Sequence, residues 1–401
     1  MNQAVRTAPA TSALADPQSL GLSAGGLDRL RRVLRREIQD ERLPGAVAMV
    51  ARQGKLGFLE AFGVQNPASG TPMQIDSIFR IYSMTKPVVS VAIMMLVEEG
   101  RLCLADPLAK YVPAFADPKV AIERDGRLDL VPAEQPITIQ DLLRHTSGLT
   151  YEFSGEGAVQ RMYLDKNLPS TNQTNTEQVE RLASLPLFSQ PGQQWNYSRS
   201  TDVLGRLVEI ISGETLGQFL QKRIFAPLGM SDTGFHVPEE KQRRIVEPFA
   251  KDPETGDAVR LLDVCRPAKF ESGGGGLVST ITDYARFVAM LAAGGVLDGQ
   301  RLLARKTIEL MRSDHLGANV KIGSELLQPG YGFGLGFAVR TQPGMSVTPG
   351  SPGQYFWGGF AGTTFWIDPA EELYAMLMIQ APGQRDYCRA VFRTLVYAAL
   401  E

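Results

Sequence analysis

Residues 83–97 read SMTKPVVSVAIMMLV, a serine and a lysine followed by an apolar run. After Lys86 the run holds no charged residue, which predicts a helix buried on every side and closed by a glycine cap at Gly100. Ser83 and Lys86 are three residues apart, so on a helix both side chains lie on one face. A lysine entering an apolar helix is costly unless it has a function. The stretch therefore predicts a serine nucleophile with a lysine beside it.

The chemistry of this pair requires that Lys86 act as a base near neutral pH. Its pKa must then fall by about 3 units from the ordinary value of about 10.4, and desolvation against the apolar helix favours such a fall. Ser83 would also lie near unpaired backbone N–H groups that can stabilise an oxyanion. The spacing alone is common by chance, and a capping serine beside a surface lysine is the alternative.

Composition narrows the function classes. The chain has 401 residues, 44% of them apolar and 21% charged, which is enough for one large enzyme-sized unit or two subdomains sharing a cleft. A formal charge of -2 predicts no nucleic-acid partner and no attraction to anionic lipid. The three histidines are scattered, so neither a metal site nor a cofactor is expected. The three cysteines, Cys103, Cys265 and Cys388, are interpreted as buried free thiols.

The N-terminal segment and the longest apolar run indicate where in the cell the protein is expected. Residues 1–21 are rich in Ala, Thr, Ser and Pro but lack the apolar core of a secretory signal, so a flexible leader is predicted. The apolar run 88–97 is about half of the roughly 20 residues that a membrane span needs. The sequence therefore predicts a cytoplasmic protein without a membrane segment.

The order of elements predicts an α+β fold. Strand patterns lie near both chain ends, at 45–51, 56–63, 334–340, 363–367 and 373–380, with a helix at 23–42 and another at 385–400 whose Val391 and Leu395 point inward. Gln53-Gly54 and Asp368-Pro369 are the expected turns. We therefore expect an antiparallel sheet with flanking helices from 22–113 and 272–401, and a mainly helical subdomain from 114–271 that forms the other wall of a cleft.

Other motifs are assigned to structure. Gly21-Leu22-Ser23-Ala24-Gly25 matches a nucleophile elbow, but no strand precedes it, so Ser23 is predicted to cap a helix. His145 is expected to be a hydrogen-bonded structural residue. The glycines 273–276 lack the sequel of a phosphate loop and are interpreted as a turn near the cleft.

Several segments together resemble one family. The segment 76–87, DSIFRIYSMTKP, resembles the active-site segment of serine β-lactamases and penicillin-binding-protein-like esterases, above all the class C β-lactamase-like family VIII carboxylesterases. The segments 138–149, 227–230 and 273–280 resemble further family segments in the same order. The resemblance implies a β-lactamase/transpeptidase-like fold with the active site between the sheet and the helical subdomain.

The resemblance also implies further site residues. Tyr197, in Trp195-Asn-Tyr-Ser-Arg199, fits the catalytic tyrosine, whose pKa Lys86 is expected to lower from about 10. A tyrosine that only fills the core is the alternative. Arg199 stands where the lactamases have an asparagine that contacts the substrate, which weakens a lactam interpretation.

A third family segment concerns the strand beside the serine. The Lys-Thr-Gly motif of lactamases cannot occur here in its usual place, because the last lysine of the chain is Lys321. Trp357-Gly358-Gly359 stands there instead and resembles the Trp-Gly-Gly form of this motif in family VIII esterases. A tryptophan favours neutral esters over anionic lactams, and we expect these three residues and Arg199 to bind substrate. By resemblance, the backbone N–H groups of Ser83 and Phe360 form the oxyanion hole.

The sequence therefore predicts a serine carboxylesterase that hydrolyses short- to medium-chain esters through an acyl-enzyme on Ser83. Its expected partner is a small-molecule ester, and its oligomeric state is not readable. A β-lactamase, a D-amino acid peptidase and an acyltransferase are alternatives on the same scaffold. A catalytically silent binding protein is a fourth alternative from a different class.

Overall fold

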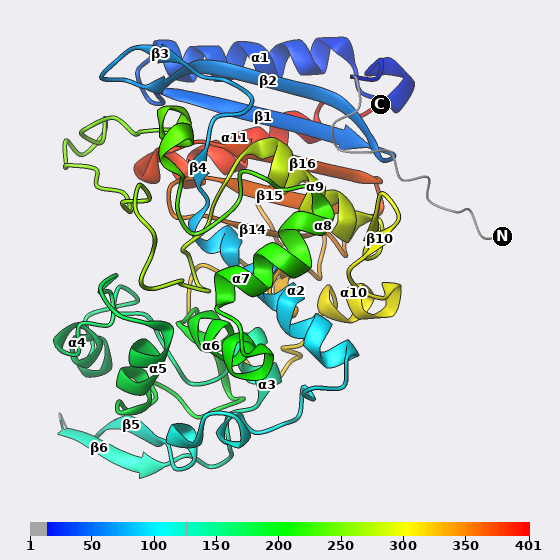
Figure 1. Ribbon diagram of the computed structural model, residues 1–401. Coiled ribbons are helices and arrows are strands. Elements are labelled where there is room, and N and C mark those ends of the chain that lie inside the picture. The colour runs from blue at the N-terminus through cyan, green and yellow to red at the C-terminus, as the bar shows by residue number, and fades with distance from the viewer. Residues whose placement is uncertain (1–13, 125–126) are drawn as a thin grey trace.

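One antiparallel sheet forms the centre of the computed structural model, which describes residues 14–124 and 127–401 (Figure 1). Its order is β12-β13-β14-β15-β16-β1-β2-β3. The strands are β1 (Gly45–Arg52), β2 (Lys55–Asn66), β3 (Thr71–Pro72), β12 (Tyr331–Phe333), β13 (Ala338–Arg340), β14 (Tyr355–Gly358), β15 (Thr364–Asp368) and β16 (Leu373–Met378). The two chain ends meet where β1 pairs with β16, so the predicted sheet is confirmed.

The two faces of the sheet bury different helices. Along β1, Ala46 and Ala48 belong to the apolar cluster that holds α1 (Ala24–Gln39) and α11 (Arg385–Tyr397). Val47 and Met49 face the opposite way, into the cluster of α2 (Thr85–Glu98) and α9 (Ile281–Ala292). Because successive strand residues point to opposite faces, a strand covered on both sides is apolar throughout. Helices thus cover both faces of the sheet, and Lys86 lies on α2, one of the helices on the face of Val47 and Met49.

The predicted helix cap at Ser23 and the predicted turn at Gln53-Gly54 are both present. The Ser23 side chain accepts a hydrogen bond of 3.0 Å from Gly26 N–H and caps α1, as predicted. Gln53 and Gly54 both have positive φ, 55° and 71°, which is the backbone of a tight hairpin turn. The predicted turn between β1 and β2 is confirmed.

The middle of the chain is mainly helical. Its helices are α3 (Ile139–Leu143), α4 (Ala158–Asp165), α5 (Asn175–Ala183), α6 (Ser200–Ser212), α7 (Leu216–Leu220) and α8 (Ala226–Leu228), and α10 (Arg305–Met311) follows α9. The hairpin of β5 (Lys119–Arg124) and β6 (Arg127–Pro132) was not predicted. The remaining pairs are β4 (Phe79–Arg80) with β8 (Val278–Ser279), β7 (Gln194–Trp195) with β11 (Lys321–Ile322), and β9 (Val296–Leu297) with β10 (Gln300–Arg301).

One prediction about the C-terminal part is wrong, and another is confirmed only for one of its two residues. Residues 334–340 are not one strand, because the chain turns through Gly336, at φ 99°, between β12 and β13. On α11, Leu395 is partly buried and packs against the core, as predicted. The fully buried apolar residues of this helix are Cys388, Phe392 and Val396, and Val391 is only half-buried. The Phe392 ring meets the Trp366 ring of β15 edge-on, at 5.5 Å between centroids.

The predicted leader and buried thiols need correction as well. Residues 1–13 lie outside the described residues, but residues 14–21 pack on the molecule, with Leu20 buried. Cys103 and Cys265 are exposed because they lie in surface loops, and only Cys388 is buried. Within the described ranges, no helix combines the length and the apolarity needed to cross a bilayer.

Candidate active site

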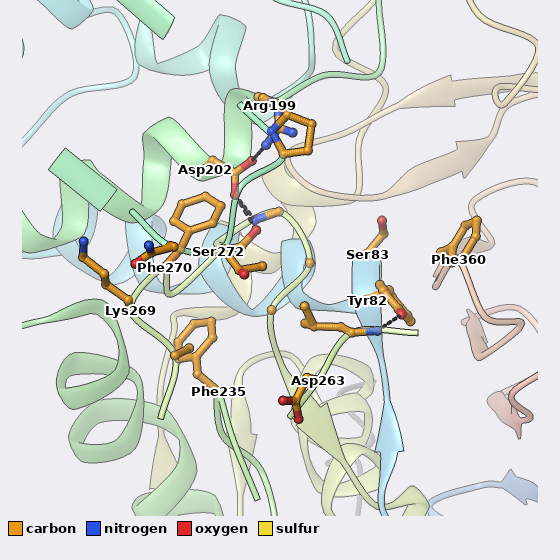
Figure 2. Close-up of a pocket in the computed structure, with 18 of the residues that line it drawn as sticks. Tyr82, Ser83, Arg199, Asp202, Phe235, Asp263, Lys269, Phe270, Ser272 and Phe360 are labelled. Carbon is orange, nitrogen blue, oxygen red and sulfur yellow. Dashed lines mark hydrogen bonds and ion pairs between the residues drawn. The ribbon is translucent and has the colours of Figure 1, made fainter. Parts of the chain in front are cut away.

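A cavity of about 620 Å³ opens beside the start of α2. Seven segments contribute to its lining: Tyr82 and Ser83, residues 151–153, residues within 169–172, the start of α6, Phe235, residues within 262–276, and Phe360. Figure 2 shows Ser83 with Phe360 on one side and the segment of Phe270 and Ser272 on the other. The nucleophile candidate therefore faces a space large enough for a small ligand.

The backbone at Ser83 is held in an unusual shape. Ser83 lies in a single 3-10 turn, Tyr82–Met84, that leads directly into α2. Tyr82, just before it, has φ 44°, a left-handed conformation that an aromatic residue rarely adopts. The Tyr82 hydroxyl accepts a hydrogen bond of 2.9 Å from Leu262 N–H, which anchors this residue. The turn presents Ser83 at the helix N-terminus, as predicted.

Lys86 is buried and makes three hydrogen bonds. Its Nζ lies 2.6 Å from the Gly274 carbonyl, 3.0 Å from the Tyr151 hydroxyl and 3.3 Å from Ser83 Oγ. Burial lowers the pKa of Lys86 to about 7, the Asp202 carboxylate raises it in part, and Arg199 adds to the lowering. A neutral lysine beside the serine is thus available near neutral pH, which is the fall in pKa that the sequence argument required.

The three partners match the hydrogen-bonding capacity of a neutral amine. The Gly274 carbonyl can only accept, so it takes one N–H of Lys86. The Tyr151 hydroxyl takes the second N–H. The amine lone pair then remains for the Ser83 hydroxyl proton. The geometry can therefore support proton transfer from Ser83 to Lys86.

Tyr197 lies next to Tyr151, with 5.3 Å between the ring centroids, but its contact with Lys86 differs from the expected one. Lys86 Nζ sits 4.4 Å from the centre of the Tyr197 ring, and its hydrogen bond to a phenol goes to Tyr151 instead. The Trp357 indole N–H donates to the Tyr197 hydroxyl at 3.3 Å. Burial raises the pKa of Tyr197 above 10, and the interactions with Ser83 and Trp357 offset this only in part. The prediction that Lys86 lowers this pKa is wrong, because desolvation dominates and Tyr197 stays protonated.

Tyr151 is a site residue that the sequence argument missed. It is buried, its ring stacks on Phe153 at 4.6 Å, and burial raises its pKa well above 10. The one sequence feature that could have pointed to Tyr151 is its position, two residues after Leu149, which ends the family-like segment 138–149. No spacing rule links this position to Lys86.

Arg199 belongs to a buried ion-pair group. Its guanidinium donates to both Glu152 carboxylate oxygens, at 3.0 and 2.7 Å, and lies 3.6 Å from Asp202. Asp202 in turn accepts hydrogen bonds from Gly274 N–H at 2.9 Å and from Ser272 Oγ at 2.6 Å (Figure 2). Asp202 thus anchors the loop that supplies the Gly274 carbonyl, and Arg199 pairs with Asp202. Its predicted contact with substrate stays a prediction.

The Trp357-Gly358-Gly359 segment lies behind the cavity wall. In the part of the chain that the structure describes, the cavity lining includes Phe360 but none of these three residues. Trp357 instead supports Tyr197, and Gly359 packs so closely that a Cβ there would lie 2.4 Å from the Ile81 carbonyl. Their direct contact with substrate and the oxyanion hole of Ser83 and Phe360 stay predictions.

His145 and the glycine run 273–276 have the structural roles predicted for them. His145 is buried, its Nδ1 lies 3.1 Å from Ser198 Oγ, and desolvation lowers its pKa well below 6.5. Residues 273–275 form a turn, and Gly274 to Gly276 line the cavity, as predicted for the glycine run.

Comparison with known proteins agrees with this geometry. Residues 30–398 match the β-lactamase family, and the chain belongs to that family. The chain is 41% identical to Protein Rv1367c of Mycobacterium tuberculosis, over 84% of this chain and 86% of that protein. It is 33% identical to Esterase EstB of Burkholderia gladioli, over 97% of this chain and all of EstB.

The solved structure of EstCE1, a hydrolase with promiscuous acyltransferase activity, matches at a TM-score of 0.78 with 27% identity, over 93% of this chain and 98% of EstCE1. The predicted β-lactamase/transpeptidase-like fold and the resemblance to family VIII esterases are thereby confirmed.

The electrostatics of Lys86 give the first prediction. The Asp202 carboxylate favours the charged amine, so Asp202→Asn should lower the pKa of Lys86 below about 7. Asparagine keeps an acceptor for Gly274 N–H and Ser272 Oγ. The change is measurable by NMR titration of protein labelled with 13C-lysine, with the Lys86 signal identified by its loss in Lys86→Met.

Glu271→Gln is the matched control, because it removes a carboxylate from the same loop that has no part in the pKa of Lys86. The control should titrate like the wild type. An Asp202→Asn protein whose Lys86 titrates at an unchanged or higher pH would contradict the electrostatic account.

Proposed function

We propose that the protein is a serine carboxylesterase that hydrolyses short- to medium-chain carboxylic esters. The observation that carries the proposal is the buried Lys86 amine, with a pKa of about 7, 3.3 Å from Ser83 Oγ at the edge of the cavity. The similarity to Esterase EstB over almost the whole chain supports ester hydrolysis on this scaffold.

The first half of the reaction makes the acyl-enzyme. Ser83 Oγ attacks the ester carbonyl carbon while its proton passes to neutral Lys86. The carbonyl oxygen becomes an oxyanion that accepts from the N–H groups of Ser83 and Phe360. When the carbon–oxygen bond to the alcohol breaks, Tyr197 gives its hydroxyl proton to the departing alkoxide, and Lys86 returns a proton to Tyr197. The acyl group is then on Ser83, and the proton count is unchanged.

In the second half of the reaction, water takes the place of the alcohol. Its proton passes to Lys86 as its oxygen attacks the acyl carbon, and Ser83 recovers a proton when the acid leaves. Tyr197 acts as an acid in this scheme, since its raised pKa keeps it protonated.

The cavity supports a substrate with an apolar acyl group. Leu262, Pro267, Phe270 and Phe235 line it on the side of the glycine turn. Arg199 is already paired with Glu152, so it is a poor partner for the carboxylate of a lactam. The apolar lining supports a neutral ester, and the cations that remain in the lining, Arg266 and Lys269, belong to the same loop as Phe270.

The second prediction concerns the three proposed catalytic residues. Ser83→Ala should abolish hydrolysis of p-nitrophenyl butyrate, and Lys86→Ala and Tyr197→Phe should each reduce turnover by about 100-fold or more, because each removes a proton-transfer group. Initial rates on purified proteins measure this, with circular dichroism to show that each variant is folded. Folded variants with wild-type rates would overturn the assigned roles.

Acyl transfer is the second candidate function, because the matched structure of EstCE1 is described as a hydrolase with promiscuous acyltransferase activity. An acyl group on Ser83 reacts with any bound alcohol that competes with water. Phe153 and Phe360, which are 66% and 48% exposed at the cavity, offer an aromatic surface for such an acceptor.

The third prediction separates the two activities. With p-nitrophenyl butyrate as donor, added 1-butanol should yield butyl butyrate at the expense of butyric acid, and gas chromatography measures both. Both products should disappear in Ser83→Ala. Free acid alone, at every alcohol concentration, would exclude acyl transfer to this acceptor and leave hydrolysis as the function.

A further inference from the structure

The turn between β14 and β15 is held by an arginine from α11. Arg389 donates through Nη2 to the Gly359 carbonyl and, at 3.1 Å, to the Thr363 carbonyl. Gly359 N–H donates to the Thr363 carbonyl at 2.8 Å, and Gly362 N–H donates to the Gly359 carbonyl at 3.0 Å. The guanidinium therefore holds this tight turn through two of its carbonyl groups.

This contact bears on Phe360 through a single peptide unit. The Gly359 carbonyl and the Phe360 N–H belong to the same planar peptide, in which the two groups point in opposite directions. A carbonyl that is fixed toward Arg389 fixes the Phe360 N–H away from it. Phe360 lines the cavity with Ser83, and its ring meets that of Tyr82 edge-on at 5.5 Å.

We infer that Arg389 is a positioning residue, which orients and polarises the Gly359–Phe360 peptide so that the Phe360 N–H serves as an oxyanion donor. The inference rests on the proposed function. A cation bound to a carbonyl withdraws electron density from the peptide and makes its N–H a stronger donor. The charge thus acts on the oxyanion without touching the substrate.

The contact with Arg389 explains why glycines occupy positions 358 and 359. A Cβ on Gly358 would lie 2.7 Å from the Arg389 guanidinium carbon, so a side chain there would displace the cation. A Cβ on Gly359 would lie 2.3 Å from Thr363 Oγ1, which would open the turn. Both glycines allow the approach that the peptide contact needs.

The surroundings of Arg389 show that its charge is not balanced by a close ion pair. Asp386 lies 3.5 Å away, beyond a good hydrogen bond, and is 78% exposed. The Arg389 Nε is buried and has no hydrogen-bond partner among the residues that the structure describes. Desolvation lowers the pKa of Arg389 to about 10, so the group remains charged at neutral pH.

The fourth prediction uses Arg389→Met, which keeps an apolar stem and removes the charge and the donors. We expect kcat for p-nitrophenyl butyrate to fall about 10-fold with little change in KM, less than the loss of a whole oxyanion donor. The decisive readout is the hemiketal that Ser83 forms with 13C-carbonyl-labelled 1,1,1-trifluoro-2-hexanone. In Arg389→Met, its hydroxyl should ionise at a higher pH in 13C NMR.

Arg393→Met is the matched control. Arg393 lies one turn further along α11 and is more deeply buried than Arg389, whose side chain is 26% exposed, and its hydrogen bond goes to the Tyr331 hydroxyl at 3.2 Å. Its hemiketal should ionise as in the wild type. Arg389→Lys, which keeps a positive charge, should restore part of the loss, and Arg389→Gln replaces Arg389→Met if the methionine variant does not fold.

Three results would overturn the inference. The first is an unchanged hemiketal titration in folded Arg389→Met, or in folded Arg389→Gln if the methionine variant does not fold. The second is an equal shift in Arg393→Met, which would indicate a general effect of losing a buried arginine. The third is a wild-type protein that forms no hemiketal, and this result alone would overturn the proposed function as well.

Discussion

The hydrogen bonds of one buried amine connect the parts of this molecule. Lys86 Nζ joins α2, on which it lies, to Tyr151 of the helical wall and to the carbonyl of Gly274 in the glycine turn. The amine can occupy this place at modest cost only in its neutral form, because burial penalises the charge. The enclosure of Lys86 in its neutral form therefore links the packing around the cavity to the reactivity of Ser83.

The glycine turn and the β14–β15 turn perform comparable tasks on the two sides of Ser83. In the first, Asp202 accepts from Gly274 N–H, so that the carbonyl of the same residue is held beside Lys86. In the second, Arg389 binds the Gly359 carbonyl, and we infer that this aims the N–H of the next residue. A charged side chain thus fixes a backbone group in each case, and glycines supply the close approach.

Much of this arrangement could be predicted from local sequence. The spacing of Ser83 and Lys86, the cap at Ser23 and the turn at Gln53-Gly54 depend on neighbouring residues, and the structure agrees with each. What could not be predicted depends on contacts between distant segments. Tyr151 meets Lys86, and Arg389 meets Gly359, only after the chain has folded. The pKa of Tyr197 was misjudged for the same reason, since its burial is a tertiary property.

The most direct test of the central claim is the pH dependence of Ser83 phosphonylation by a fluorophosphonate probe, followed by peptide mass mapping. The account predicts a label on the peptide that contains Ser83, at a rate that rises with pH through about 7 as Lys86 loses its proton. A label on another residue would contradict the account. A labelling rate at Ser83 that stays flat across that pH range would contradict the role of Lys86 as its base.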